Sequence, residues 1–156
     1  MLEVYQRKSA NHLDTFDDEL ILDHTQREKG RFKAHLSSGE EVRVFLTRGQ
    51  RLTIGEILVS ECGRQLSVAG ASEPTVMAVA DDWKQFSKAC YHLGNRHVKV
   101  QIGDCWLRIT PDHVLEDMLK QIGMTLRLVN SVFVPESGAY LNKLAQDKPH
   151  HHAHQH

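Results

Sequence analysis

The chain has 156 residues, of which 40% are hydrophobic and 25% are charged, and its formal net charge is -1. This composition is typical of a folded soluble protein, and a net charge so close to zero provides no general field to attract nucleic acid or an anionic membrane. Cys62, Cys90 and Cys105 lie far apart without CxxC spacing, which argues against a disulfide framework and a structural zinc site. No segment has the apolar length of a signal peptide or membrane span, so we expect a cytoplasmic protein.

The first part of the chain, up to about residue 73, predicts short strands. Apolar and polar residues alternate from Glu41 to Thr47, which is the period of a half-buried strand. The turn signal at residues 37–40 makes residues 31–36 the expected hairpin partner. Further strands are expected at residues 19–24, 56–61 and 65–69, with Gly63 marking a turn between the last two. Because its predicted elements are all short strands, we interpret this part as a small all-β domain. It contains no repeat and no catalytic motif.

The segment from Gly70 to Pro74 is the predicted domain boundary. A short apolar strand at residues 75–80 follows it. Asp81 and Asp82 then predict the start of a helix, which Gly94 would end. The expected apolar face of this helix consists of Trp83, Phe86, Cys90 and Leu93.

Two strands, a second helix and a final strand complete this part of the chain. Alternation predicts strands at residues 98–102 and 105–109, and Thr110 is the expected N-cap of a helix that ends before Gly123. A last strand is expected at residues 125–133. The order β-α-β-β-α-β is the split βαβ or ferredoxin-like arrangement, so the predicted fold class is α+β. The expected core face of the second helix is Val114, Leu115, Met118, Leu119 and Ile122.

A histidine-rich tail ends the sequence. Such a run has no apolar partner that would offset the entropy lost on ordering, so we expect it to be disordered. Neutral imidazoles bind borderline metal ions such as nickel, zinc and copper. A purification tag is the alternative interpretation, but Ala153 and Gln155 interrupt the run and favour a native tail. The five histidines of the last seven residues are His150, His151, His152, His154 and His156.

Two histidines outside the tail are candidate ligands. His97 lies beyond the predicted helix end at Gly94, where a structural role is the more frequent one for a lone histidine. His92 lies five residues earlier, about 140° around a helix, so the two cannot share an ion on one continuous helix. His113 falls in the first turn of the second helix, where the helix dipole favours the neutral ring. A surface histidine weakly paired with Asp117 is the alternative there.

Catalysis is not predicted. Cys90 with His92 as its base is the one imaginable nucleophilic pair, but Cys90 belongs to the predicted packing face of its helix. The sequence shows no third orienting group and no oxyanion motif. We therefore expect a protein that is not an enzyme.

Three segments of the chain resemble the UreE family of urease accessory proteins. They are YHLGNRH at residues 91–97, DHVL at 112–115 with Met118 and Leu119, and FVPESGAY at 133–140. They occur in the family's order, and the histidine-rich tail follows them. The resemblance implies a nickel metallochaperone for urease maturation. It implies a peptide- or partner-binding β domain (1–73), a ferredoxin-like metal-binding and dimerisation domain (74–142) and a flexible tail (143–156).

The resemblance also implies roles for individual histidines. The family forms a homodimer through its second domain, and the histidine that ends its GNRH motif lies near the two-fold axis, so His97 of each subunit would share one metal ion. His113 matches a peripheral metal ligand, although Pro111 stands where some members have another histidine. The tail would collect Ni(II), and Zn(II) or Cu(II) would compete for the same imidazoles. The expected partners are the urease accessory GTPase and the apo-urease accessory complex.

Two other functions remain open from the sequence. A general metal-storage or buffering protein would use the same histidines without a urease partner. RNA binding is suggested by the β-α-β-β-α-β order, which RNA-recognition domains share. Those domains stack bases on strand aromatics within a basic motif, whereas residues 98–102 contain no aromatic and 105–110 contain Trp106 alone.

Overall fold

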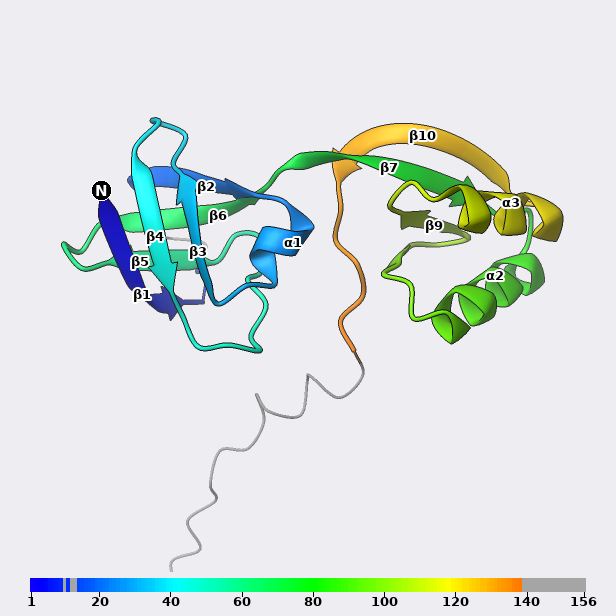
Figure 1. Cartoon of the computed structure of the whole chain (residues 1–156), viewed down its shortest axis with the longest axis horizontal. Coiled ribbons are helices and arrows are strands. Elements are labelled where there is room, and N and C mark those ends of the chain that lie inside the picture. Colours follow the sequence, from blue (N-terminus) through cyan, green and yellow to red (C-terminus); the bar gives the residue numbers. More distant parts are fainter. Residues whose placement is uncertain (10, 12–13, 139–156) are drawn as a thin grey trace, which may run out of the picture.

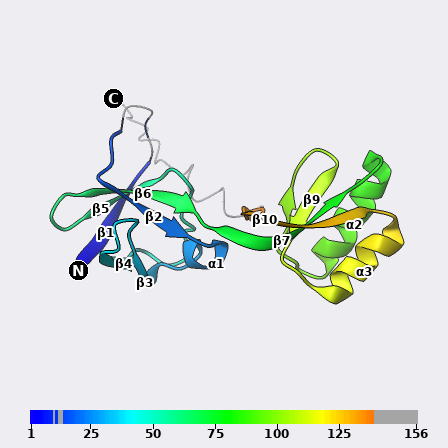
Figure 2. The same cartoon turned by 90° about the horizontal axis from the view of Figure 1, so that it is seen from above.

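Two sheets, each with its own buried cluster, form the two domains of this α+β chain. The structure is a computed structural model that describes residues 1–9, 11 and 14–138. The N-terminal domain is mostly β, and the C-terminal domain combines a sheet with two helices (Figure 1). In the view from above, β7 runs from one domain into the other (Figure 2). Within the described residues, no helix is long and apolar enough to cross a membrane.

The N-terminal domain has a six-stranded sheet of order β2-β6-β5-β1-β4-β3. Its buried face is made of aliphatic side chains such as Val4, Leu20 and Val44, which are completely removed from solvent. The strands are β1 (Leu2–Lys8), β2 (Asp18–Leu22), β3 (Arg31–His35), β4 (Glu41–Phe45), β5 (Ile57–Ser60) and β6 (Gln65–Gly70), and the one short helix is α1 (His24–Arg27).

Several sequence predictions for this domain are confirmed. Strands β3 and β4 form the expected antiparallel hairpin, and Gly63 adopts φ +85° in the turn between β5 and β6. Two elements were not predicted. Strand β1 contains polar residues on its exposed face and pairs with β4 and β5, both distant in sequence. Helix α1 occupies the end of the expected strand at residues 19–24, because Asp23 and Gln26 form a capping box that turns the chain.

The C-terminal domain has a four-stranded antiparallel sheet of order β10-β7-β9-β8. Two helices pack on this sheet through a cluster that includes Phe86, Leu93, Leu107 and Leu119. In chain order the elements are β7 (Ser72–Val79), α2 (Trp83–Asn95), β8 (Gln101–Ile102), β9 (Trp106–Ile109), α3 (His113–Ile122) and β10 (Thr125–Val132).

The predicted domain boundary is not a loop. Strand β6 ends at Gly70 and β7 begins at Ser72, so the chain crosses between the two sheets with Ala71 alone between the strands. Pro74 lies inside β7, where it opposes Asn130 of the edge strand β10. A proline donates no backbone hydrogen bond, but β7 pairs with β9 only from Val76 onward, so at Pro74 the strand has a partner on one side alone and tolerates that loss.

Both predicted helices exist, but the predicted apolar face of each includes a residue that is exposed. Trp83 is 59% exposed and Val114 is 74% exposed, whereas the prediction placed both in the core. Both residues lie in the first turn of their helix. The N-cap of α3 is Asp112 rather than Thr110, because its carboxylate accepts a hydrogen bond from the Leu115 amide at 3.0 Å. The expected strand at residues 98–102 shortens to β8.

The chain that follows β10 runs between the two domains (Figure 1). Phe133 is completely buried there, and its ring meets His24 edge-on with 5.0 Å between centroids. His24 donates its backbone N–H to a Glu73 oxygen at 2.9 Å, and its ring contacts the same carboxylate at 2.7 Å. The junction is thus a packed interface with its own polar contacts.

Candidate metal centre

His97 follows the C-cap of helix α2, and the chain turns toward the sheet at this residue. The Val98 amide donates to the Leu93 carbonyl at 3.2 Å, and the His97 amide donates to the Gly94 carbonyl at 3.0 Å. These two bonds are those of a Schellman motif, in which the residue after the C-cap takes a left-handed conformation. His97 has φ +54°, so it occupies the place that glycine usually holds.

This geometry corrects the predicted end of the helix at Gly94. Helix α2 continues to Asn95, and Gly94 lies within it. The left-handed backbone costs a residue with a Cβ about 1–2 kcal/mol compared with right-handed geometry. Strained residues of this kind cluster at functional sites. The His97 side chain is exposed, so the turn presents an imidazole to solvent from a fixed backbone.

His92 does not join His97. Its side chain is half-buried and meets the ring of Tyr91 edge-on, with 5.3 Å between centroids. Its carbonyl accepts a hydrogen bond from the Arg96 guanidinium at 3.2 Å. Tyr91 is 70% exposed, which places a large aromatic ring on the surface less than two turns before His97.

His113 lies in the first turn of helix α3, as predicted, although the helix begins at His113 itself rather than at Pro111; its side chain is exposed. The N-cap Asp112 fixes the backbone beside it, and the Glu116 carboxylate accepts the Asp112 amide at 3.1 Å. Asp117, one turn on, is exposed as well.

A single copy of the chain brings no complete ligand set together in its described part. Among residues 1–9, 11 and 14–138, no group of three or more histidine, cysteine, aspartate or glutamate side chains is placed to hold a metal ion. His97 and His113 therefore remain separate single donors. The five predicted tail ligands, from His150 to His156, lie outside the described residues.

The cysteines do not extend the candidate centre. Burial raises the pKa of the Cys90 thiol, which favours the neutral form and a packing role, as the sequence indicated. A hydrogen bond from the Ser60 hydroxyl lowers the pKa of Cys62, helped by backbone amides of the same turn. Cys62 belongs to the N-terminal domain, in the turn between β5 and β6.

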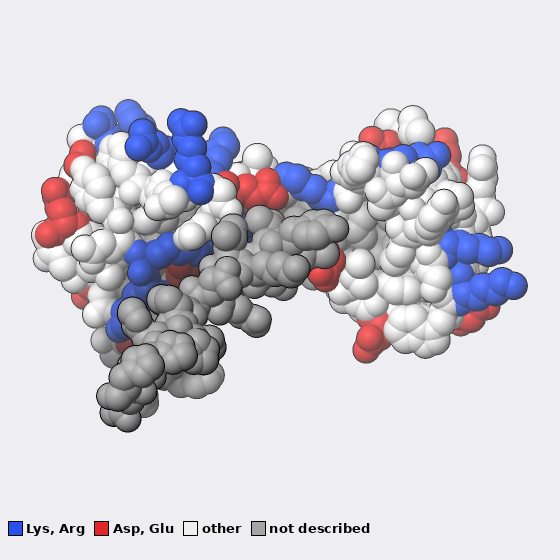
Figure 3. Space-filling model, turned by 90° about the horizontal axis from the view of Figure 1, so that it is seen from below, with Lys and Arg blue, Asp and Glu red and all other residues white. Residues whose placement is uncertain are grey.

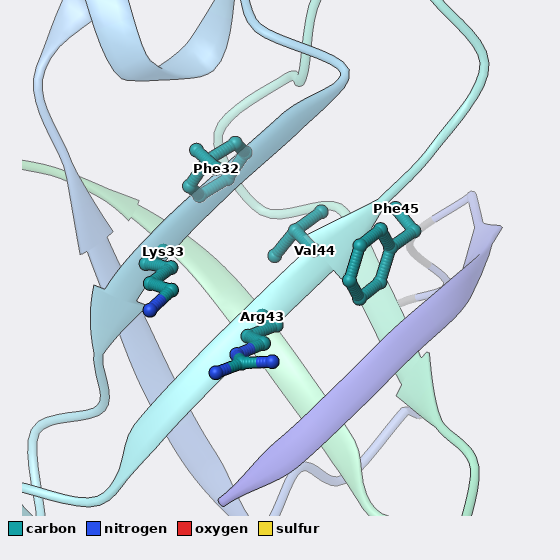
Figure 4. A pocket seen from close by; sticks show the side chains of 5 residues that line it. All are labelled: Phe32, Lys33, Arg43, Val44 and Phe45. Atoms are coloured by element: carbon teal, nitrogen blue, oxygen red, sulfur yellow. The ribbon is translucent and has the colours of Figure 1, made fainter.

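The N-terminal domain has a surface hollow that the sequence did not predict. It measures about 270 Å³ and lies where β3 and β4 pair (Figure 4). The Arg43 Nε atom is buried and has no hydrogen-bond partner among the described residues. Lysine and arginine side chains also gather over this domain in the view from below (Figure 3). The residues that line the hollow are Phe32, Lys33, Arg43, Val44 and Phe45.

Comparison with known proteins identifies the class of this two-domain chain. Residues 3–71 match the model of the UreE urease accessory protein N-terminal domain, and residues 73–156 match that of the C-terminal domain. The urease accessory protein UreE of Marinomonas sp. (strain MWYL1) is 54% identical over 140 residues, covering 90% of this chain and 95% of that protein. UreE of Psychromonas ingrahamii is 43% identical over 156 residues, covering 100% of this chain and 99% of that protein.

The chain belongs to the UreE family of urease accessory proteins. The family name describes an accessory protein of urease maturation rather than an enzyme. The resemblance drawn from residues 91–97, 112–119 and 133–140 is therefore confirmed.

The left-handed turn yields a stability prediction. Glycine adopts φ +54° without the Cβ penalty, so His97→Gly should be more stable than His97→Ala by about 1 kcal/mol. Urea unfolding of both variants measures the difference. Arg96 has φ -98°, so at that control position alanine should be at least as stable as glycine. Equal stability of the two His97 variants would contradict the strain.

Proposed function

We propose that this chain is a nickel metallochaperone, which binds Ni(II) at a histidine site shared by two subunits and delivers it to the urease metallocentre. The observation that carries the proposal is the exposed His97 imidazole on a left-handed turn, in a chain of the UreE family. A strained turn that keeps histidine where glycine is more stable suggests selection for the imidazole rather than for the fold.

A dimer supplies the second imidazole. A two-fold interface brings identical side chains together, so one His97 per chain makes a two-histidine site at the axis. Exposed apolar side chains on α2 and α3 support an interface on this layer: Trp83, Tyr91 and Val114. Singly scattered apolar residues are common on surfaces, but here the three lie on the two adjoining helices of one domain. We assign them to contact with a second copy of the chain.

The remaining histidines act as accessories in this proposal. His113 is a peripheral ligand, and His150, His151, His152, His154 and His156 collect ions for the central site. Two imidazoles leave nickel coordinatively unsaturated, so water or tail histidines complete the shell. A shell with exchangeable members suits a protein that must release its ion. Zn(II) and Cu(II) bind the same donors, and Cu(II) binds more tightly by the Irving–Williams order.

The domain roles follow the same proposal. Residues 1–73 bind a peptide or partner protein, for which the hollow lined by Phe32 and Phe45 is a candidate surface. Residues 74–142 form the metal-binding and dimerisation domain, and residues 143–156 the tail. The sheet order β10-β7-β9-β8 supports a ferredoxin-like arrangement. The partners would be the urease accessory GTPase and the apo-urease accessory complex, in the cytoplasm.

A general metal-buffering protein is the alternative, because the same histidines store ions without any urease. Binding to the accessory GTPase and to apo-urease separates the two functions. A chaperone is retained by immobilised apo-urease complex in a pull-down, and a buffer is not. The family membership favours the chaperone.

The shared site predicts distinct effects of two changes. His97→Ala should abolish the tightest nickel binding event of the dimer, because neither chain then has an imidazole at the two-fold axis. Truncation after Lys148 should preserve that event and lower the number of ions bound. Isothermal titration calorimetry measures both. A tight event that survives in His97→Ala would refute the shared site.

Nickel affinity should depend on pH. Protons compete with metal ions for imidazole nitrogen, and histidine ordinarily titrates near about 6.5. We expect affinity to fall as pH is lowered through that value and to level off above it. Equilibrium dialysis between pH 5 and 8 provides the measurement, and a constant affinity over this range would contradict histidine ligation.

The dimer interface predicts a third outcome. Tyr91→Asp places a charge beside the proposed axis and should shift the protein toward monomer, with loss of the tight nickel event. Ile21→Asp is the matched control, because Ile21 is also an exposed apolar residue but lies in the N-terminal domain. Sedimentation equilibrium reports the oligomeric state. A Tyr91→Asp variant that dimerises like the control would place the interface elsewhere.

A further inference from the structure

The residues that follow β10 are held by the N-terminal domain. We call residues 133–138 the stem, because they lead into the histidine-rich tail. Arg27 of helix α1 is only 1% exposed, and its guanidinium donates to the Leu22 carbonyl at 2.7 Å and to the Phe133 carbonyl. Arg51 donates to the Pro135 carbonyl at 2.5 Å. Two arginines of one domain thus bind the backbone of a segment that belongs to the other.

The burial of Arg27 marks these contacts as more than surface pairing. Burial lowers the pKa of its guanidinium, and the nearby Glu73 carboxylate opposes that shift. A buried cation is tolerated where hydrogen bonds compensate for its lost hydration, and here the acceptors of the Arg27 guanidinium are the main-chain carbonyls of Leu22 and Phe133. Carbonyl acceptors depend on the path of the backbone and not on side-chain identity. The contacts therefore fix where the stem runs.

The other side of the stem lies against residues 99–102, the segment that follows His97 and leads into β8. The Glu136 amide donates to the Val100 carbonyl at 2.8 Å, and the Val134 amide donates to the Gln101 side-chain oxygen at 3.1 Å. Val100 is three residues from His97, a path of at most about 10 Å. The N-terminal domain also holds this segment directly, because the Lys99 ammonium group pairs with the Glu28 carboxylate at 2.6 Å.

The stem leads the chain from one edge of the four-stranded sheet toward the opposite edge before the tail begins. Strands β10 and β8 are the two opposite edges of the four-stranded sheet, three strand spacings or about 14 Å apart. The chain leaves β10 at Val132, yet Glu136 is bound beside the start of β8. Without the stem contacts, the tail would start from the far edge.

We infer that Arg27 and Arg51 are positioning residues, through which the N-terminal domain fixes the root of the metal-collecting tail beside the turn that carries His97. Thirteen residues lie between Glu136 and His150, so the chain between them can reach at most about 50 Å. A shift of the root by about 14 Å takes up a substantial part of that reach. It lowers the effective concentration of tail histidines at His97 about three- to tenfold.

This inference rests on the proposed collecting role of the tail, but its test requires neither nickel delivery nor urease. The full chain is prepared with His97→Ala and His113→Ala, so that a substoichiometric amount of paramagnetic Cu²⁺ binds to the tail. Amide broadening by the bound ion is then measured by NMR at residues 99–102. Truncation after Lys148 should remove this broadening and so assigns it to the tail.

Arg51→Ala in this background should reduce the broadening at residues 99–102 about three- to tenfold, while the tail still binds copper. Arg51→Lys keeps a donor for the Pro135 carbonyl and should restore part of it. Arg48→Ala is the matched control, because Arg48 is an exposed arginine of the same loop. The dispersion of the remaining spectrum shows that each variant is folded. Equal broadening in Arg51→Ala and Arg48→Ala would overturn the inference, whatever the outcome for nickel transfer.

Discussion

In the proposed site, the turn at the end of helix α2 determines where the metal ion is bound. A Schellman turn needs a left-handed residue, and that residue is His97 rather than glycine. The two backbone bonds from His97 and Val98 hold the turn, so the imidazole projects from a defined point on the surface. Every other part of the proposed site depends on that point, because a single exposed imidazole needs a second donor to hold an ion.

Symmetry and the junction provide two routes to further donors. Dimerisation through the helical layer would bring a second His97 to the same axis. Both domains hold the stem, since the Glu136 amide donates to the Val100 carbonyl and Arg51 of the other domain donates to the Pro135 carbonyl. In the account proposed above, these contacts set where the metal-collecting tail begins.

Much of the fold was predictable from local sequence patterns. The β3–β4 hairpin, both long helices and the glycine C-cap at Gly123 follow from alternation, helical spacing and capping residues. Strand β1 was missed because its pairing with β4 and β5 is long-range and only its inner face is apolar. Trp83 and Val114 were misplaced in the core because periodicity does not show where the covering sheet ends.

The candidate site, like the fold, could be predicted from the sequence only in part. Position alone favoured a structural role for His97, and the family motif at residues 91–97 was needed to single it out as a ligand. The left-handed backbone of His97 and the buried Arg27 have no local sequence signal. The first depends on the hydrogen bonds of Leu93 and Gly94, and the second on a contact between residues 106 positions apart. Such features arise from the folded chain.

A mixed dimer tests the central claim most directly. Heterodimers of one unchanged subunit and one His97→Ala subunit, isolated with two different affinity tags, are titrated with nickel. A site that requires both imidazoles predicts that the heterodimer lacks the tight binding event, as the His97→Ala homodimer does. A heterodimer that retains half of the tight sites would show that each chain binds its own ion, which contradicts a shared centre.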